Sequence, residues 1–143
     1  MKTRKARTAL LLSLLVITAS VLCACAEQNP SEDIPENKAL HLTITMTYPE
    51  KVEPANYIKD YKFRVEKGTS LLEGLQLFCK VNDISLNIDT TNNVVEGING
   101  VNNGDMKHYE WKCRINDEEV TDSPDTVKLK DNDHVEWYYT KVK

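Results

Sequence analysis

The stretch GTSLLEGLQLFC, residues 68–79, decides the fold because it is the one segment behind the export signal with helical spacing. Its apolar side chains recur every three or four residues, which places them on one face of a helix. Ser70 and Glu73 match the capping box that begins many helices. The pattern predicts a single helix that begins after Ser70 and ends near Asn82.

The segments on both sides of this helix alternate between apolar and polar residues, which is the period of a strand buried on one face. Four such segments are residues 40–47, 61–66, 109–115 and 135–140. A fifth strand is expected around Val94, Val95 and Ile98, within a polar stretch rich in Asn. Because one helix can cover only one face of a sheet, we predict an α+β domain of β-grasp type. It has a mixed sheet of about five strands, one helix packed on one face, and the other face in water.

The first 25 residues have the layout of an export signal. Residues 2–7 carry four basic side chains and no acidic one, and an apolar run of roughly 14 residues follows. A membrane-spanning helix needs about 20 apolar residues, so the pattern favours a cleaved signal over a permanent span.

The apolar run ends in Leu22-Cys23-Ala24-Cys25, which resembles the lipobox of bacterial lipoproteins. In that motif a Leu and a small residue precede the acceptor cysteine, so Cys25 fits, whereas Cys23 directly follows the bulky Leu22. The resemblance implies cleavage after Ala24 and a diacylglyceryl thioether on Cys25. The protein would then be anchored at the outer face of the bacterial cytoplasmic membrane. The alternative is an ordinary signal that leaves two stray thiols.

Residues 26–38 are acidic and polar, contain two prolines and offer one large apolar side chain, Ile34, so we expect an unfolded tether. As a coil it would hold the domain roughly 20 Å from the bilayer. The expected organisation is a lipoprotein signal peptide over 1–24, the lipidated Cys and a disordered tether over 25–38, and one folded domain over 39–143.

Charge and motifs exclude several classes of function. Without the signal, 14 Lys and Arg stand against 22 Asp and Glu, and no basic stripe for nucleic acid is present. The sequence has no Gly-x-Ser-x-Gly motif and no phosphate loop, so we expect no enzyme. The three histidines lie in separate elements, and the acidic turn Asp131–Asp133 lacks the features of a calcium loop. We therefore expect no metal and no cofactor, and expect this turn only to shape the fold.

Cys79 and Cys113 are expected to point into the same core layer, one from the helix and one from a strand. In an oxidising compartment a disulfide between them is geometrically plausible, and in the chain-entropy model it would stabilise the fold by about 4 kcal/mol. Two buried free thiols are the alternative.

Four segments in register with the expected elements resemble the family of transcobalamin-like C-terminal domains. They are GTSLL at 68–72, INGV at 98–101, Trp111 placed four residues before Ile115-Asn116, and LKDNDHVEW at 129–137. This family is a β-grasp domain of surface proteins in Gram-positive bacteria, similar to the cobalamin-contacting domain of animal cobalamin carriers. The likeness covers roughly residues 40–143. Asp117 and Asn132 stand where the family usually has Gly, and both residue types tolerate the left-handed backbone of such turns.

The resemblance implies a binding protein that captures a small molecule, with cobalamin or a related vitamin as first candidate, for delivery to a membrane transporter. A loop rich in Asn and Gly beside exposed tyrosines would suit a flat ligand that bears amides, such as a corrin ring, or a glycan. The expected ligand-binding residues are Asn99, Gly100, Asn102, Asn103, Tyr109 and Tyr138. Trp111, Trp137 and Tyr139 are expected in the core. The alternative function is a surface module that contacts another protein or the cell wall and has no small ligand.

Overall fold

The computed structural model describes residues 30–49, 51–52 and 58–143. The expected signal peptide, Cys25 and the first residues of the expected tether lie outside these residues. The elements in chain order are η1 (Glu36–Lys38), β1 (Ala39–Thr47), β2 (Ile58–Glu66), α1 (Leu71–Val81), β3 (Leu86–Asp89), β4 (Val94–Ile98), β5 (Val101–Asn102), β6 (Tyr109–Ile115), β7 (Glu118–Glu119) and β8 (His134–Lys141).

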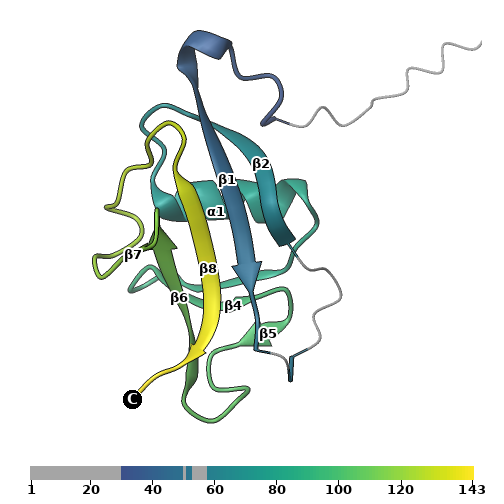
Figure 1. Cartoon of the computed structure of the whole chain (residues 1–143), viewed down its shortest axis with the longest axis vertical. Helices are drawn as coiled ribbons and strands as arrows, with labels where there is room; N and C mark the ends of the chain where they lie inside the picture. Colours follow the sequence, from purple (N-terminus) through teal and green to yellow (C-terminus); the bar gives the residue numbers. More distant parts are fainter. Residues whose placement is uncertain (1–29, 50, 53–57) are drawn as a thin grey trace, which may run out of the picture.

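Five strands form the main sheet, in the order β2-β1-β8-β6-β7. β1 and β8 run parallel at its centre, and each of the other neighbouring pairs is antiparallel. α1 crosses behind the sheet on one face (Figure 1). The predicted architecture, one helix on one face of a mixed five-stranded sheet, is confirmed.

β1 shows how the period of the sequence becomes a buried face. Leu42 lies opposite Phe63 of β2, and Met46 lies opposite Trp137 of β8. The apolar residues of β1 are at most 6% exposed: Leu40, Leu42, Ile44 and Met46. The same face receives α1, so the alternation in the sequence marks the side of the sheet that the helix covers.

α1 begins where the sequence predicts. The Ser70 hydroxyl accepts a hydrogen bond from the Glu73 amide at 3.2 Å, and the Glu73 carboxylate accepts one from the Ser70 amide at 2.7 Å. This capping box satisfies two backbone donors that the first turn would otherwise leave unpaired. Phe78, which is fully buried, meets the ring of Phe63 edge to face at 5.2 Å and thereby joins α1 to β2.

A second sheet of three short strands, β3-β4-β5, follows the helix in the chain. Of these strands the sequence predicted only β4. Val95 and Ile98 of β4 are 4% and 0% exposed. The Trp111 indole donates to the Val101 carbonyl at 2.8 Å and so connects β6 of the main sheet to β5. The second sheet therefore extends the same core.

The end of the expected tether is ordered against β2 instead of unfolded. Ser31 and Ile34 are 4% and 8% exposed. The Arg64 guanidinium donates through Nη2 to the Ile34 carbonyl at 2.6 Å and to the Glu36 carboxylate at 3.1 Å. Arg64 thus provides hydrogen bonds to a segment whose composition alone predicts no folded structure. The ordered chain therefore begins before residue 39.

The predicted disulfide is absent, because Cys79 and Cys113 are both free cysteines in the structure. Their burial, at 2% and 5% exposure, agrees with the expected core position. Each thiol is accommodated separately, and the Cys113 Sγ donates to the Arg114 carbonyl of its own strand at 3.7 Å. The alternative of two buried thiols is the one the structure adopts.

Candidate functional site

The expected ligand loop is a tight hairpin between β4 and β5. Asn99 and Gly100 have φ of 54° and 78°, the left-handed pair that an Asn-Gly hairpin turn requires. Gly100 is exposed and Asn99 is half-buried. The turn therefore presents backbone at the end of the second sheet.

Asn103 is part of the scaffold of the loop. Its side-chain oxygen accepts from the Trp111 amide at 2.8 Å, and its side-chain amide donates to the Val95 carbonyl at 3.0 Å. One side chain thus ties β6 of the main sheet to β4 of the second sheet. The sequence shows the Asn but cannot show that both of its polar atoms are used within the fold.

Asn102 is exposed but held by its backbone. Its amide donates to the Asp105 carboxylate at 2.7 Å, and its carbonyl accepts from the Tyr139 hydroxyl at 2.8 Å. The loop is therefore rigidly placed while Gly100, Asn102 and Gly104 remain open to solvent.

An aromatic cluster lies beneath this loop, at the end of the sheet where β1 finishes and β6 begins. Tyr48 meets Trp111 edge to face at 5.3 Å, Trp111 meets Tyr139 at 5.5 Å, and Tyr139 meets Tyr109 at 5.6 Å. Trp111 and Tyr139 are 6% and 3% exposed, which agrees with their expected core position. Burial raises the pKa of Tyr48. Tyr48 and Tyr109 are both half-buried, so these two members of the cluster combine packing with access, and Tyr109 is the one that directly follows the loop in the chain. We call the loop 99–104 together with Tyr109 the loop end.

Tyr138 lies on the opposite face of the sheet and does not join the loop end. Its neighbour in β8, Tyr139, points into the core, so the alternation of the strand sends Tyr138 outward. The Arg114 guanidinium lies 5.0 Å from its ring centroid, as in a cation–π pair. Of the six expected ligand residues, the structure gathers five at one end and separates this one.

The open sheet face carries a hydrogen-bonded network that the sequence did not single out. The Glu136 carboxylate accepts from the Arg114 Nε and from the Thr47 hydroxyl, both at 2.6 Å. Glu136 is only 9% exposed, and the hydrogen bond from Arg114 is the main reason that its pKa is lowered. Its position on the polar side of β8 is readable from the sequence, but its partners on β6 and β1 depend on register.

The acidic turn shapes the fold, as expected. Asp133 is 5% exposed and accepts from the Asn116 side chain at 2.9 Å and from the Lys130 amide at 2.8 Å. Asp117 and Asn132, which replace the usual glycines, have φ of 70° and 67°. Both turns therefore keep the left-handed backbone without glycine.

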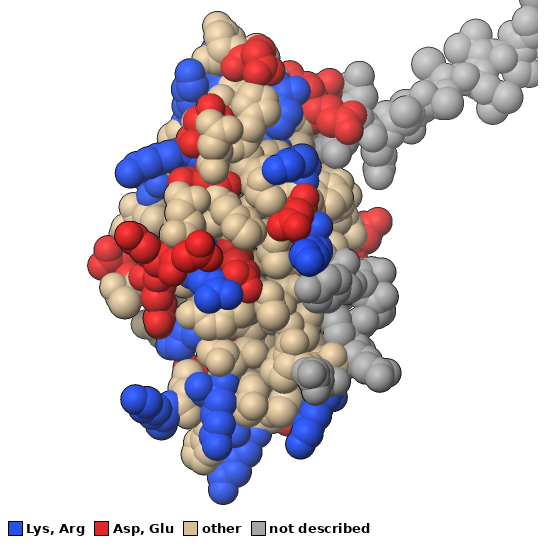
Figure 2. Space-filling view, in the orientation of Figure 1, with Lys and Arg blue, Asp and Glu red and all other residues tan. Residues whose placement is uncertain are grey.

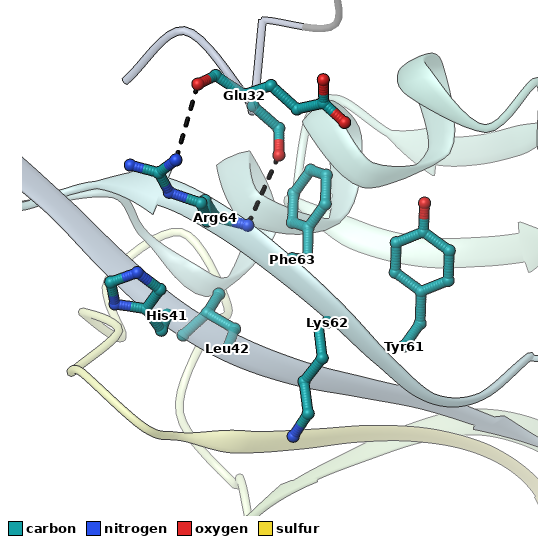
Figure 3. A pocket seen from close by; sticks show the side chains of 8 residues that line it. Glu32, His41, Leu42, Tyr61, Lys62, Phe63 and Arg64 are labelled. Carbon is teal, nitrogen blue, oxygen red and sulfur yellow. Dashed lines mark hydrogen bonds between the residues drawn. The ribbon is translucent and has the colours of Figure 1, made fainter. Parts of the chain in front are cut away.

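A pocket of about 330 Å³ lies along β2 next to the ordered residues 31–34, and we call it the β2-edge pocket. Figure 3 shows Glu32 above Phe63, with Arg64 and Tyr61 on either side of that pair. Arg64 donates to the Glu32 carbonyl at 3.5 Å and through its backbone amide to the Ser31 hydroxyl at 3.4 Å. The pocket exists because the 31–34 segment is ordered against β2, and the sequence alone does not predict this order.

Among the described residues, no group of three or more His, Cys, Asp or Glu side chains is placed to hold a metal ion. Within the same residues no helix is both long and apolar enough to cross a membrane. At the loop end, the polar groups of the loop suit hydrogen bonding and the ring of Tyr109 suits stacking.

Several solved structures share the fold of this chain, and two of them are described here. Haptocorrin in complex with Cbi aligns with a TM-score of 0.56 and 13% sequence identity over 78% of this chain. That alignment spans only 27% of haptocorrin, so this chain corresponds to one part of the larger protein. A suggested metal binding protein from Ruminococcus gnavus aligns with a TM-score of 0.51 and 16% identity, over 73% of this chain and 99% of that protein.

A search of curated proteins by sequence found no match. The family described as Domain of unknown function (DUF4430) matches residues 68–141, from the turn before α1 to the last residue of β8. These residues supply the helix, the second sheet and three of the five strands of the main sheet, which is more than half of the chain. The chain therefore belongs to the DUF4430 family.

Proposed function

We propose that this protein is a non-enzymatic binding protein, held at the outer face of the cytoplasmic membrane by a lipid on Cys25. Its loop end captures a small molecule, with a corrinoid as first candidate, and passes it to a membrane transporter. The observation that carries the proposal is the hydrogen-bonded loop 99–104, whose exposed residues Gly100, Asn102 and Gly104 lie close to the half-buried Tyr109.

The rigidity of the loop favours binding because fewer conformations are lost when a ligand is held. Asn103 and the backbone of Asn102 are fixed by the hydrogen bonds to Trp111, Val95 and Asp105. Gly100 and Gly104 have φ of 78° and 84°, and no atom lies within 4 Å of where a Cβ would stand on either. Open space at both glycines leaves room for a ligand to approach the backbone.

The chemistry of a corrinoid matches these groups. A corrin ring is broad and apolar on its faces and carries amide side chains at its rim, so it can stack on Tyr109 and exchange hydrogen bonds with the exposed Asn102. Haptocorrin, whose corresponding part shares this fold, was solved with Cbi, which supports trying corrinoids first.

The proposed anchor has a direct test. Wild-type protein should partition with membranes and take up a lipid probe, Cys25→Ser should lose both properties, and Cys23→Ser should keep them. Cys23 is the matched control because it lies two residues away in the same motif. Equal lipid labelling of wild type and Cys25→Ser would overturn the anchor.

The proposed ligand is tested by titrating the purified protein with a panel of corrinoids and following tryptophan emission. Trp111 belongs to the aromatic cluster under the loop, so a bound corrin would quench its emission by energy transfer. Saturable quenching by at least one corrinoid supports the proposal. A panel without saturable binding would exclude corrinoids and favour a surface that contacts another protein.

A further inference from the structure

We infer that Asn99 and Gly100 form a self-modification site, at which the Asn99 side chain cyclises onto the backbone and loses ammonia without an enzyme. The loop 99–104 contains two Asn-Gly pairs, Asn99-Gly100 and Asn103-Gly104. Asparagine is thermolabile, and a glycine after it favours this reaction because no side chain hinders the approach of the glycine nitrogen. The surroundings of the two pairs differ, and they direct the reaction to the first pair.

The reaction needs only this chain and one water molecule. The Gly100 amide nitrogen gives up its proton to solvent and attacks Cγ of Asn99. The C–N bond of the side-chain amide breaks, and ammonia leaves with a proton taken from solvent. The product is a five-membered succinimide ring, which water then opens at either carbonyl to give aspartate or isoaspartate. Nothing is oxidised or reduced.

The Asn103-Gly104 pair is held by three hydrogen bonds. The Gly104 amide, which contains the attacking nitrogen of this pair, donates to the Tyr109 carbonyl at 2.9 Å. The Asn103 side chain accepts from the Trp111 amide at 2.8 Å and donates to the Val95 carbonyl at 3.0 Å. Ring closure at this pair therefore disrupts all three bonds.

The Asn99-Gly100 pair lies at the tip of the hairpin between β4 and β5. The ladder of this hairpin pairs Ile98 with Val101, so both residues of the tip lie outside it. Within the described part of the chain, the Gly100 amide donates no hydrogen bond, and Gly100 is exposed. Its proton is thus open to the water that has to remove it before the nitrogen attacks.

The attacking nitrogen is what separates the two pairs. The Asn99 side chain is not free either, because it interacts with Tyr48 at the end of β1. Space is equal as well, since no atom lies within 4 Å of where a Cβ would stand on Gly100 or Gly104. The nitrogen of Gly104 is engaged in a hydrogen bond, whereas that of Gly100 is open to solvent.

The products change both the charge and the shape of the loop end. Exposed lysines gather at the end of the domain where β8 finishes (Figure 2), among them Lys141, which lies opposite Tyr109. A carboxylate formed at residue 99 adds the opposite charge near that end. Isoaspartate also adds a methylene group to the backbone, which disturbs the left-handed pair that a two-residue turn requires. The reaction itself does not depend on the function proposed above.

The test incubates the purified, folded protein at mildly alkaline pH and follows both pairs by mass spectrometry of peptides. Each conversion to aspartate or isoaspartate raises the mass by one dalton, and fragmentation assigns it to residue 99 or residue 103. The matched control is the same chain in denaturant, where both pairs lose their hydrogen bonds and keep the same chemistry. Hydrogen exchange of the two glycine amides is an independent measurement on the folded protein.

We expect Asn99 to convert at least about tenfold faster than Asn103 in the folded protein, because a hydrogen bond restrains only the second attacking nitrogen. The Gly100 amide should also exchange faster than the Gly104 amide, and the two conversion rates should become similar in denaturant. Similar rates in the folded protein, faster conversion of Asn103, or no conversion of Asn99 would each overturn the inference. A tenfold difference that persists in denaturant would assign the preference to the flanking sequence and contradict the structural cause.

Discussion

Asn103 joins the two sheets through a single side chain, and this role can be separated from ligand binding. Asn103→Ala removes both hydrogen bonds and leaves the Trp111 amide and the Val95 carbonyl without this partner. The expected loss is about 1–3 kcal/mol in the free energy of unfolding. Chemical denaturation measures it, and Asn102→Ala is the control. That change removes an exposed side chain and one long hydrogen bond to Asp105, at 3.4 Å, and should change stability by less than about 0.5 kcal/mol. An Asn103→Ala variant as stable as wild type would refute the scaffold role.

The two buried thiols should be unreactive in the native protein. Burial raises the pKa of the Cys79 thiol to about 12 and also raises the pKa of Cys113. The thiolate is the reactive form, so at pH 8 both should react with a disulfide reagent at least about a hundredfold more slowly in folded than in denatured protein. The measurement is the rate at which the two cysteines react with the disulfide reagent, with and without denaturant. Fast labelling of either cysteine in the folded state would contradict the burial described here.

At the level of single residues, the sequence was a good guide to which side chains are buried. It was a poorer guide to which polar groups are available to a ligand. Burial follows from alternation, so Trp111, Tyr139 and Cys113 were placed correctly. Availability depends on partners far away in the sequence, and this is why Asn103 and Tyr138 were predicted to bind ligand although one is used within the fold and the other lies on the opposite face.

At the level of elements, the Glu136 network links three neighbouring strands across the open sheet face. Hydrogen bonding lowers the pKa of Glu136 from its ordinary value near 4.5, so its contribution to stability is present above about pH 4.5 and is lost as the pH falls through the lowered pKa. Glu136→Gln should therefore lower the free energy of unfolding by about 1–2 kcal/mol at pH 7 and by less under acid conditions. Denaturation at pH 7 and at pH 3 measures both values. A destabilisation equally large at the two pH values would exclude the ionised carboxylate as its cause.

The same contrast between local and distant information explains which elements were predicted. α1 and its cap are encoded within residues 70–82, and four long strands carry the two-residue period, so the sequence was sufficient for them. β3, β5 and β7 have two to four residues each, too few to establish a period. The ordered segment 31–38 depends on Arg64, whose role cannot be read from the segment itself.

At the level of the whole molecule, β1 runs from one end of the domain to the other (Figure 1). η1 and the docked segment 31–34 lie at the end where β1 begins, and the loop end lies where β1 finishes. Under the proposed lipid anchor, the attached segment enters the fold at the η1 end, so the loop end lies at the opposite end of β1.

The central claim is that the loop end, and not the open sheet face, holds the ligand. Tyr109 and Tyr138 provide a matched pair, because they lie on neighbouring strands and on opposite faces of one sheet. The most direct test is the dissociation constant of the best-bound corrinoid for wild type, Tyr109→Ala and Tyr138→Ala, with thermal unfolding of each variant as the check on folding. We predict that Tyr109→Ala weakens binding by about five- to tenfold, as expected for loss of one aromatic stacking contact, and that Tyr138→Ala binds as wild type. The opposite result, a folded Tyr109→Ala that binds as wild type and a Tyr138→Ala that does not, would contradict the claim.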